Sequence, residues 1–133
     1  MISEFISIVS NIMPLRTKQM KEKYTENMSQ YQDFSGTKNF EEDQERIIHE
    51  YTHWYIITNL FPYDKIAFTH DMLVPKRVFG KMSECNKEEW EEYKTIISQF
   101  ETDAYYDAIL ENFSKNKSVP RHLHLHLIVW KEE

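Results

Sequence analysis

The stretch "SVPRHLHLHLIVW", residues 118–130, places histidine at every second position three times, with leucine between. Side chains two residues apart in a β-strand lie on the same face of the sheet. We therefore expect a strand over 122–129 with His122, His124 and His126 in a row. The intervening leucines are expected to be buried on the opposite face, so the three imidazoles line one surface of the sheet.

Three accounts of this row are open. A purely structural account is weak, because Thr or Lys would pack equally well at such strand positions. A His-x-His pair could instead present two nitrogens to one Zn²⁺, with further ligands recruited from elsewhere in the chain. In the third account, one neutral imidazole attacks phosphorus while its neighbours donate hydrogen bonds to phosphate oxygens. Only this phosphoryl or nucleotidyl chemistry uses all three histidines.

The composition is that of one compact soluble domain, with 133 residues, 41% of them hydrophobic and 29% charged. Apolar runs such as "WYIIT" (54–58) are far shorter than the ~20 residues that a membrane-spanning helix needs. The N-terminus carries Glu4 and lacks a basic start and a small-residue cleavage site, so it reads as an amphipathic helix rather than a signal peptide. The single cysteine, Cys85, cannot form an internal disulfide and favours a cytoplasmic location.

The formal net charge of the chain is −6. A broad contact with a nucleic-acid backbone normally requires a basic face, so extended nucleic acid is not an expected partner. Any recognition of phosphate must then be local, through a few residues.

Residues 1–44 are expected to form short helices, as an N-terminal extension of a domain over 45–133. Apolar residues recur at helical steps before Pro14. A second, narrower apolar stripe consists of Met20, Tyr24, Met28 and Tyr31. The stretch "NFEE" (39–42) offers an Asn-x-x-Glu capping box for a third short helix.

From residue 46 the sequence pattern changes to that of strands. The stretch 46–60 is rich in Ile, Tyr, Trp and Thr, which suits two strands joined by a tight turn at 51–53. In the stretch 64–79, Ile66, Phe68, His70 and Met72 alternate with Ala67, Thr69, Asp71 and Leu73. This alternation predicts a third strand, which ends at Pro75.

A long helix is predicted over 87–111, because Asn86 and Glu89 form a capping box and apolar residues follow at helical steps. The final strand, over 122–129, comes after a polar loop. The order strand-strand-strand-helix-strand predicts an α+β domain, built on an antiparallel sheet with the long helix packed against it.

The motif "HLHLHLI" (122–128) resembles the His-φ-His-φ-His-φ-φ signature of the histidine-triad superfamily, which comprises nucleotide-binding hydrolases and transferases. The stretches 47–63 and 69–77 resemble the first hairpin and the following strand of that family. Within the hairpin, "NLFPY" is similar to the branch of dinucleoside polyphosphate hydrolases and phosphorylases. The resemblance covers residues 45–130 and leaves the N-terminal extension outside.

The resemblance implies that His124 is a nucleophile, which forms a covalent nucleotidyl-histidine at the α-phosphate. His122 and His126 would position it. Asn59 matches an Asp or Asn that binds ribose hydroxyls in the family. His70 matches a further active-site histidine, which would set the tautomers of the triad through hydrogen bonds. An ordinary half-buried strand histidine is the alternative for His70.

Two further residues follow from the resemblance. Asn112 lies close to where the family has an Asn that contacts the phosphate and the nucleoside, and a helix C-cap is its alternative. Ser118 could donate to a phosphate or to the leaving group. Val119, however, lies where many members have Ser or Thr, and the loop 112–121 lacks glycines that let backbone amides approach phosphate.

The expected function is therefore a nucleotide hydrolase or nucleotidyl transferase, acting on a dinucleoside polyphosphate or a nucleoside phosphoramidate. The resemblance also implies a homodimer. Covalent attack by histidine requires no metal or other cofactor, and Mg²⁺ on the substrate phosphates is compatible with it. The departures at Val119 and in its loop leave a non-catalytic nucleotide-binding module as the alternative, followed by a metal-dependent enzyme that uses the histidine row.

Overall fold

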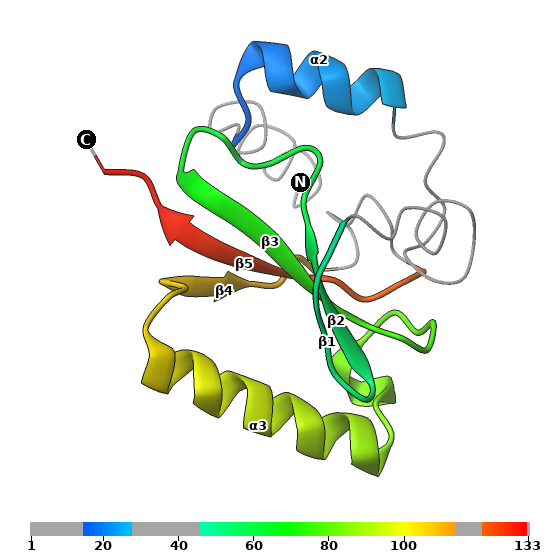
Figure 1. The fold of residues 1–133 in the computed structure, drawn as a ribbon. Helices are drawn as coiled ribbons and strands as arrows, with labels where there is room; N and C mark the ends of the chain where they lie inside the picture. Colours follow the sequence, from blue (N-terminus) through cyan, green and yellow to red (C-terminus); the bar gives the residue numbers. More distant parts are fainter. Residues whose placement is uncertain (1–14, 28–45, 114–120, 133) are drawn as a thin grey trace, which may run out of the picture.

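The computed structural model describes residues 15–27, 46–113 and 121–132. Its elements, in chain order, are α2 (Lys18–Asn27), β1 (Ile47–Glu50), β2 (Trp54–Thr58), β3 (Ala67–Pro75), the short 3₁₀ helix η3 (Met82–Glu84), α3 (Lys87–Asp103), β4 (Ala108–Leu110) and β5 (Leu125–Trp130). The strands form one antiparallel sheet in the order β1-β2-β3-β5-β4 (Figure 1). This architecture confirms the predicted α+β class and its antiparallel sheet.

The predicted hairpin over 46–60 is confirmed by β1 and β2, which pair through a turn at 51–53. The carboxylate of Glu92 on α3 accepts hydrogen bonds from the backbone N–H groups of Thr52 (3.1 Å) and His53 (2.6 Å). Strand β3 ends at Pro75, as predicted, and pairs with β2 along its C-terminal half.

The predicted helix over 87–111 begins where expected and ends earlier. The Asn86–Glu89 capping box is present at its start. The helix stops at Asp103, and its C-cap residue Ala104 has a left-handed conformation with φ 55°. The prediction extended the helix because Ala104 and Ala108 continue its apolar stripe and no Gly or Pro interrupts it.

Residues 108–110 instead form β4, which the sequence did not predict. The turn that precedes β4 is held by contacts from distant residues. Asp107 N donates to Ile128 O (2.8 Å), and Asp107 Oδ2 accepts from Trp130 N (2.8 Å). Tyr106 O–H donates to Asp71 Oδ2 at 2.6 Å. These long-range bonds draw the chain away from the helix and alongside β5.

The last strand, β5, also differs in its bounds from the predicted 122–129. It begins at Leu125, so His122 and His124 precede it and His126 lies within it. Before the strand begins, Leu123 N already donates to Phe79 O at 2.6 Å.

The main core lies between the sheet and α3. Leu123, Leu125 and Leu127 are 0–2% exposed and pack there. Their buried partners in this cluster are Trp54, Ile56, Leu73, Phe79 and Ile96. The burial of the three leucines on one face is therefore confirmed.

Helix α2 confirms a helix within the second predicted stripe, and it lies on the opposite side of the sheet from α3 (Figure 1). The helices expected at the N-terminus and around 39–46 lie outside the described residues. Among the residues that the structure describes, no helix has both the length and the apolar character to cross a membrane.

Candidate functional site: a buried histidine cluster

The three histidines of the "HLHLHL" motif lie on the face of the sheet opposite α3, since the leucines between them point into the α3 core. We expected them to line a surface, but they are buried: His122 is 0% exposed, and His124 and His126 are each 3% exposed. His70, on the neighbouring strand β3, is 5% exposed and joins them.

The first two histidines are oriented by backbone carbonyl groups. Nε2 of His122 lies 2.8 Å from Pro75 O, and Nδ1 of His124 lies 3.0 Å from His122 O. A carbonyl oxygen can only accept, so each of these nitrogens carries the proton. In a neutral His124 ring, Nε2 is then the unprotonated nitrogen, which is the atom that could attack phosphorus.

His70 and His126 are held neutral by their surroundings. Burial lowers the pKa of His70 to about 4, and the positive charge of Arg16 and the neighbouring His124 add to the effect. Burial likewise lowers the pKa of His126 to about 2, with smaller contributions from His124, His70 and Arg16. Both rings are therefore uncharged near neutral pH.

A directed chain of hydrogen bonds connects these two rings. Tyr63 N–H donates to His70 Nδ1 at 2.9 Å, so the proton of the neutral His70 ring is on Nε2. That nitrogen lies 2.7 Å from His126 Nδ1, which must accept. The proton of His126 is therefore on Nε2, which lies 3.4 Å from the Tyr63 hydroxyl.

Tyr63 and Asn112 enclose His126. The ring of Tyr63 packs against those of His70 and His126, with centroid distances of 4.6 and 4.9 Å. Asn112 Nδ2 donates to the Tyr63 hydroxyl (2.9 Å) and lies 3.4 Å from His126 Nε2. Because α3 ends at Asp103, the helix C-cap that we considered for Asn112 is wrong, and the side chain instead belongs to the histidine cluster.

Asn59 lies at the end of β2, beside His70. Its Oδ1 accepts from Phe61 N–H (2.8 Å), which fixes the orientation of the amide, and its Nδ2 lies 3.1 Å from His70 Nε2. Since His70 Nε2 already carries a proton, that contact pairs two donors. His70 therefore does not accept a hydrogen bond from the amide of Asn59. Contact between Asn59 and a ribose stays a prediction.

Ser118 and Val119 lie outside the described residues, so their expected roles also stay predictions. Sequence reasoning missed Tyr63 and Arg16 as neighbours of the cluster. Tyr63 ends the stretch "NLFPY", which carries no separate signal that this tyrosine meets the histidines. Arg16 lies in the N-terminal extension, where no motif marked it, and only the folded structure brings it near the histidines.

The described residues offer no set of side chains that supports the hypothesis of a metal site. Among residues 15–27, 46–113 and 121–132, no three His, Cys, Asp or Glu side chains are arranged to hold a metal ion. His122 donates to a carbonyl through Nε2, and His70 and His126 hydrogen-bond to each other.

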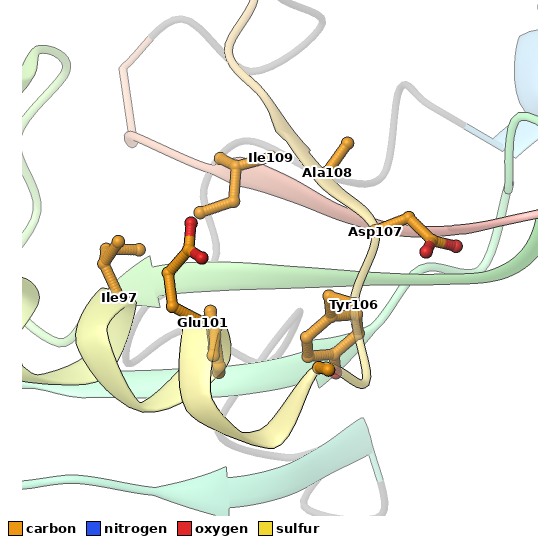
Figure 2. Close-up of a pocket in the computed structure, with 8 residues that line it drawn as sticks. Ile97, Glu101, Tyr106, Asp107, Ala108 and Ile109 are labelled. Atoms are coloured by element: carbon orange, nitrogen blue, oxygen red, sulfur yellow. The ribbon is translucent and has the colours of Figure 1, made fainter.

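A separate pocket of about 290 Å³ lies on the other face of the sheet, between the C-terminal end of α3 and β4. Figure 2 shows Ile97 and Glu101 of α3 facing Ile109 of β4 across it. The residues that line it include none of the histidines, so this pocket is distinct from the candidate site.

Comparisons with known proteins identify the fold. In sequence, the chain matches no protein-family model and no curated protein. In structure, it is similar to a HIT family hydrolase from Legionella pneumophila, with 18% identity, a TM-score of 0.50, and coverage of 65% of this chain and 82% of that one. It is also similar to a hypothetical histidine triad nucleotide-binding protein from Sulfolobus tokodaii, with 21% identity, a TM-score of 0.50, and coverage of 66% and 62%. The protein thus has the histidine-triad fold, as predicted.

Proposed function

We propose that the protein binds a nucleoside phosphate at the histidine cluster and acts as a nucleotide hydrolase or nucleotidyl transferase at the α-phosphate. The observation that carries this proposal is the orientation of His124, whose Nδ1–H donates to His122 O at 3.0 Å. That bond places the proton of a neutral ring on Nδ1, so Nε2 is the unprotonated nitrogen that attacks phosphorus in the proposed reaction.

In the proposed reaction, His124 Nε2 forms a bond to the α-phosphorus while the bond to the leaving group breaks, and the leaving group keeps the bonding electron pair. Water or another acceptor then breaks the P–N bond and releases the nucleotide. His126 contributes an Nε2–H donor that can move from the Tyr63 hydroxyl to a phosphate oxygen, where a hydrogen bond to developing negative charge lowers the barrier.

The substrate is a nucleoside monophosphate joined to a leaving group, as in a dinucleoside polyphosphate or a nucleoside phosphoramidate. In this proposal, the amide N–H bonds of Asn59 donate to ribose oxygens, and Asn112 turns from Tyr63 to a phosphate oxygen. The covalent route needs no metal from the protein, and any Mg²⁺ would accompany the substrate phosphates.

We further propose a homodimer that acts in the cytoplasm. Within the described sheet, β4 is an edge strand, and Ile109 on it is 37% exposed. Edge strands with exposed apolar side chains favour pairing with a second chain. Sedimentation of the purified protein would test the dimer.

The burial of His122, His124 and His126 favours one alternative, a nucleotide-binding module without turnover. Trapping of the intermediate separates the two functions. The protein is mixed with a fluorogenic adenosine phosphoramidate, quenched in base to preserve phosphohistidine, and digested for mass spectrometry. A nucleotidyl adduct on the His124 peptide supports the enzyme, whereas nucleotide binding with neither adduct nor turnover supports the module.

A further inference from the structure

The segment before α2 packs against the loop that carries Tyr63. Arg16 Nε donates to Phe61 O at 2.8 Å. The N–H and hydroxyl of Thr17 donate to the two oxygens of Asp64, each at 2.7 Å. These bonds hold Arg16 in one place relative to the loop, although the two segments are more than forty residues apart in the chain.

The guanidinium of Arg16 lies between two aromatic rings. Its Cζ is 4.2 Å from the centroid of Tyr24 on α2 and 4.6 Å from that of Tyr63. The ring of Tyr63 in turn packs on those of His70 and His126. Arg16 and the two imidazoles therefore contact the same aromatic ring, that of Tyr63.

Within the described residues, the charge of Arg16 is compensated by no ion pair. No carboxylate among the described residues forms an ion pair with it, since both oxygens of nearby Asp64 accept from Thr17. Among the contacts of the described chain, only Nε of its guanidinium makes a hydrogen bond to protein, so the two Nη atoms retain their donors. The same charge helps to lower the pKa of His70 and of His126, so its field reaches the cluster.

A guanidinium whose two Nη groups make no hydrogen bond to any described residue, and whose plane is fixed by two rings, is suited to bind a phosphate through two parallel hydrogen bonds. Arg16 contacts the ring of Tyr63, which packs on His70 and His126, whereas the proposed nucleophile is His124, so the phosphate at Arg16 is not the one under attack. A phosphate that Arg16 contacts must be further along the substrate.

We propose that Arg16 binds a phosphate beyond the α-phosphate, so that the site favours polyphosphate conjugates over phosphoramidates. This inference rests on the proposed function, because it assumes that the α-phosphate sits at His124. It adds a substrate-binding residue from the N-terminal extension and selects between the two substrate classes.

Binding of ADP and AMP measures the contribution of the outer phosphate. The measurements use isothermal titration calorimetry on full-length protein that carries His124→Ala, so that no nucleotide is turned over. Arg16→Gln should lower the affinity for ADP about tenfold and the affinity for AMP less than about threefold, because a charge-assisted hydrogen bond to the outer phosphate is lost. Arg16→Lys should retain part of the ADP affinity, since it keeps the charge without the planar fork.

Lys18→Gln is the matched control, because Lys18 is an exposed cation in the first turn of α2. It should leave the affinities for both nucleotides unchanged. In protein with an intact triad, Arg16→Gln should also lower kcat/KM for a dinucleoside polyphosphate more than for a phosphoramidate.

Equal losses of ADP and AMP affinity in Arg16→Gln, with no recovery in Arg16→Lys, would overturn the proposal and show that Arg16 acts only by supporting Tyr63. Unchanged ADP affinity would overturn it as well. If the His124→Ala protein with Arg16 intact bound neither ADP nor AMP, the proposed function itself would be wrong. That outcome is distinct from the failure of the Arg16 proposal.

Discussion

The imidazoles of His70 and His126 lie on adjacent strands, with His70 Nε2 and His126 Nδ1 2.7 Å apart. Tyr63 N–H donates to the far side of His70, so the proton between the two rings belongs to His70. His70 therefore sets the tautomer of His126 and directs the Nε2–H of that ring toward the hydroxyl of Tyr63.

Replacing His70 should impair both turnover and stability. His70→Leu removes the donor to His126 Nδ1 and the acceptor of Tyr63 N–H, and each unpaired buried group costs about 1–3 kcal/mol. We expect the free energy of unfolding in urea to fall by at least about 2 kcal/mol, and kcat to fall about tenfold or more. His49→Leu, at an exposed position on β1, is the control. Similar stability of the two variants would contradict the hydrogen-bonded chain.

Replacing the proposed nucleophile should abolish turnover and spare binding. His124→Ala should lower kcat by several orders of magnitude, because no neighbouring side chain can take over the covalent step. AMP affinity should change by less than about tenfold, as expected when the lost interaction acts mainly in the transition state. Steady-state kinetics and calorimetry measure the two quantities. A His124→Ala protein with substantial turnover would rule out the covalent mechanism.

Acid should destabilise the fold through the two neutral histidines. The pKa is about 4 for His70 and about 2 for His126 in the folded protein, against about 6.5 for histidine in an unfolded chain. Between these values the unfolded chain binds more protons, so the free energy of unfolding falls as pH decreases below about 6.5. The slope is at most about 1.4 kcal/mol per pH unit for each histidine.

Urea unfolding at a series of pH values between about 7.5 and 5 measures this slope. The slope should be smaller in His70→Leu by the contribution of one histidine. A wild-type slope equal to that of His70→Leu would mean that His70 is not held neutral in the fold.

Asn59 should contribute to ribose binding. Asn59→Ala should lower the affinity for AMP several-fold, which corresponds to about 1–2 kcal/mol for the lost hydrogen bonds to the ribose hydroxyls. The affinity for 2′,3′-dideoxy-AMP should fall much less, because this ligand lacks both hydroxyls. Any disturbance of the loop from loss of the bond to Phe61 N–H would affect both ligands alike, so equal losses would remove Asn59 from the ribose site.

The hydrogen bond between Tyr106 and Asp71 should stabilise the turn before β4. Asp71 is buried, and its burial raises the pKa of the carboxyl, while burial and the nearby Asp71 raise the pKa of Tyr106. Tyr106→Phe leaves Asp71 without its 2.6 Å donor and should lower the free energy of unfolding by about 1–3 kcal/mol. Tyr105→Phe, at an exposed neighbouring position, should change it by less than about 0.5 kcal/mol. Thermal or urea unfolding distinguishes the two.

The sequence by itself determined the elements whose signals are local. Alternation of His and Leu separates two faces of a strand because the side-chain period of a strand is two. The Asn86–Glu89 capping box specifies the start of α3 because all of its hydrogen bonds lie within four residues. The hairpin of β1 and β2 follows similarly from β-branched and aromatic residues on both sides of a short turn.

Tertiary structure alone decided where α3 ends and which residues meet at the site. The helical stripe continues past Ala104, but long-range bonds to Asp71, Ile128 and Trp130 hold the chain in the turn that leads into β4. Tertiary structure also brings together His70 and His126, which are 56 residues apart in the chain. It likewise brings Arg16 to Phe61, which is 45 residues away. Such contacts depend on how the strands pair and on which groups are buried together, and neither the period of the sequence nor a local cap carries that information.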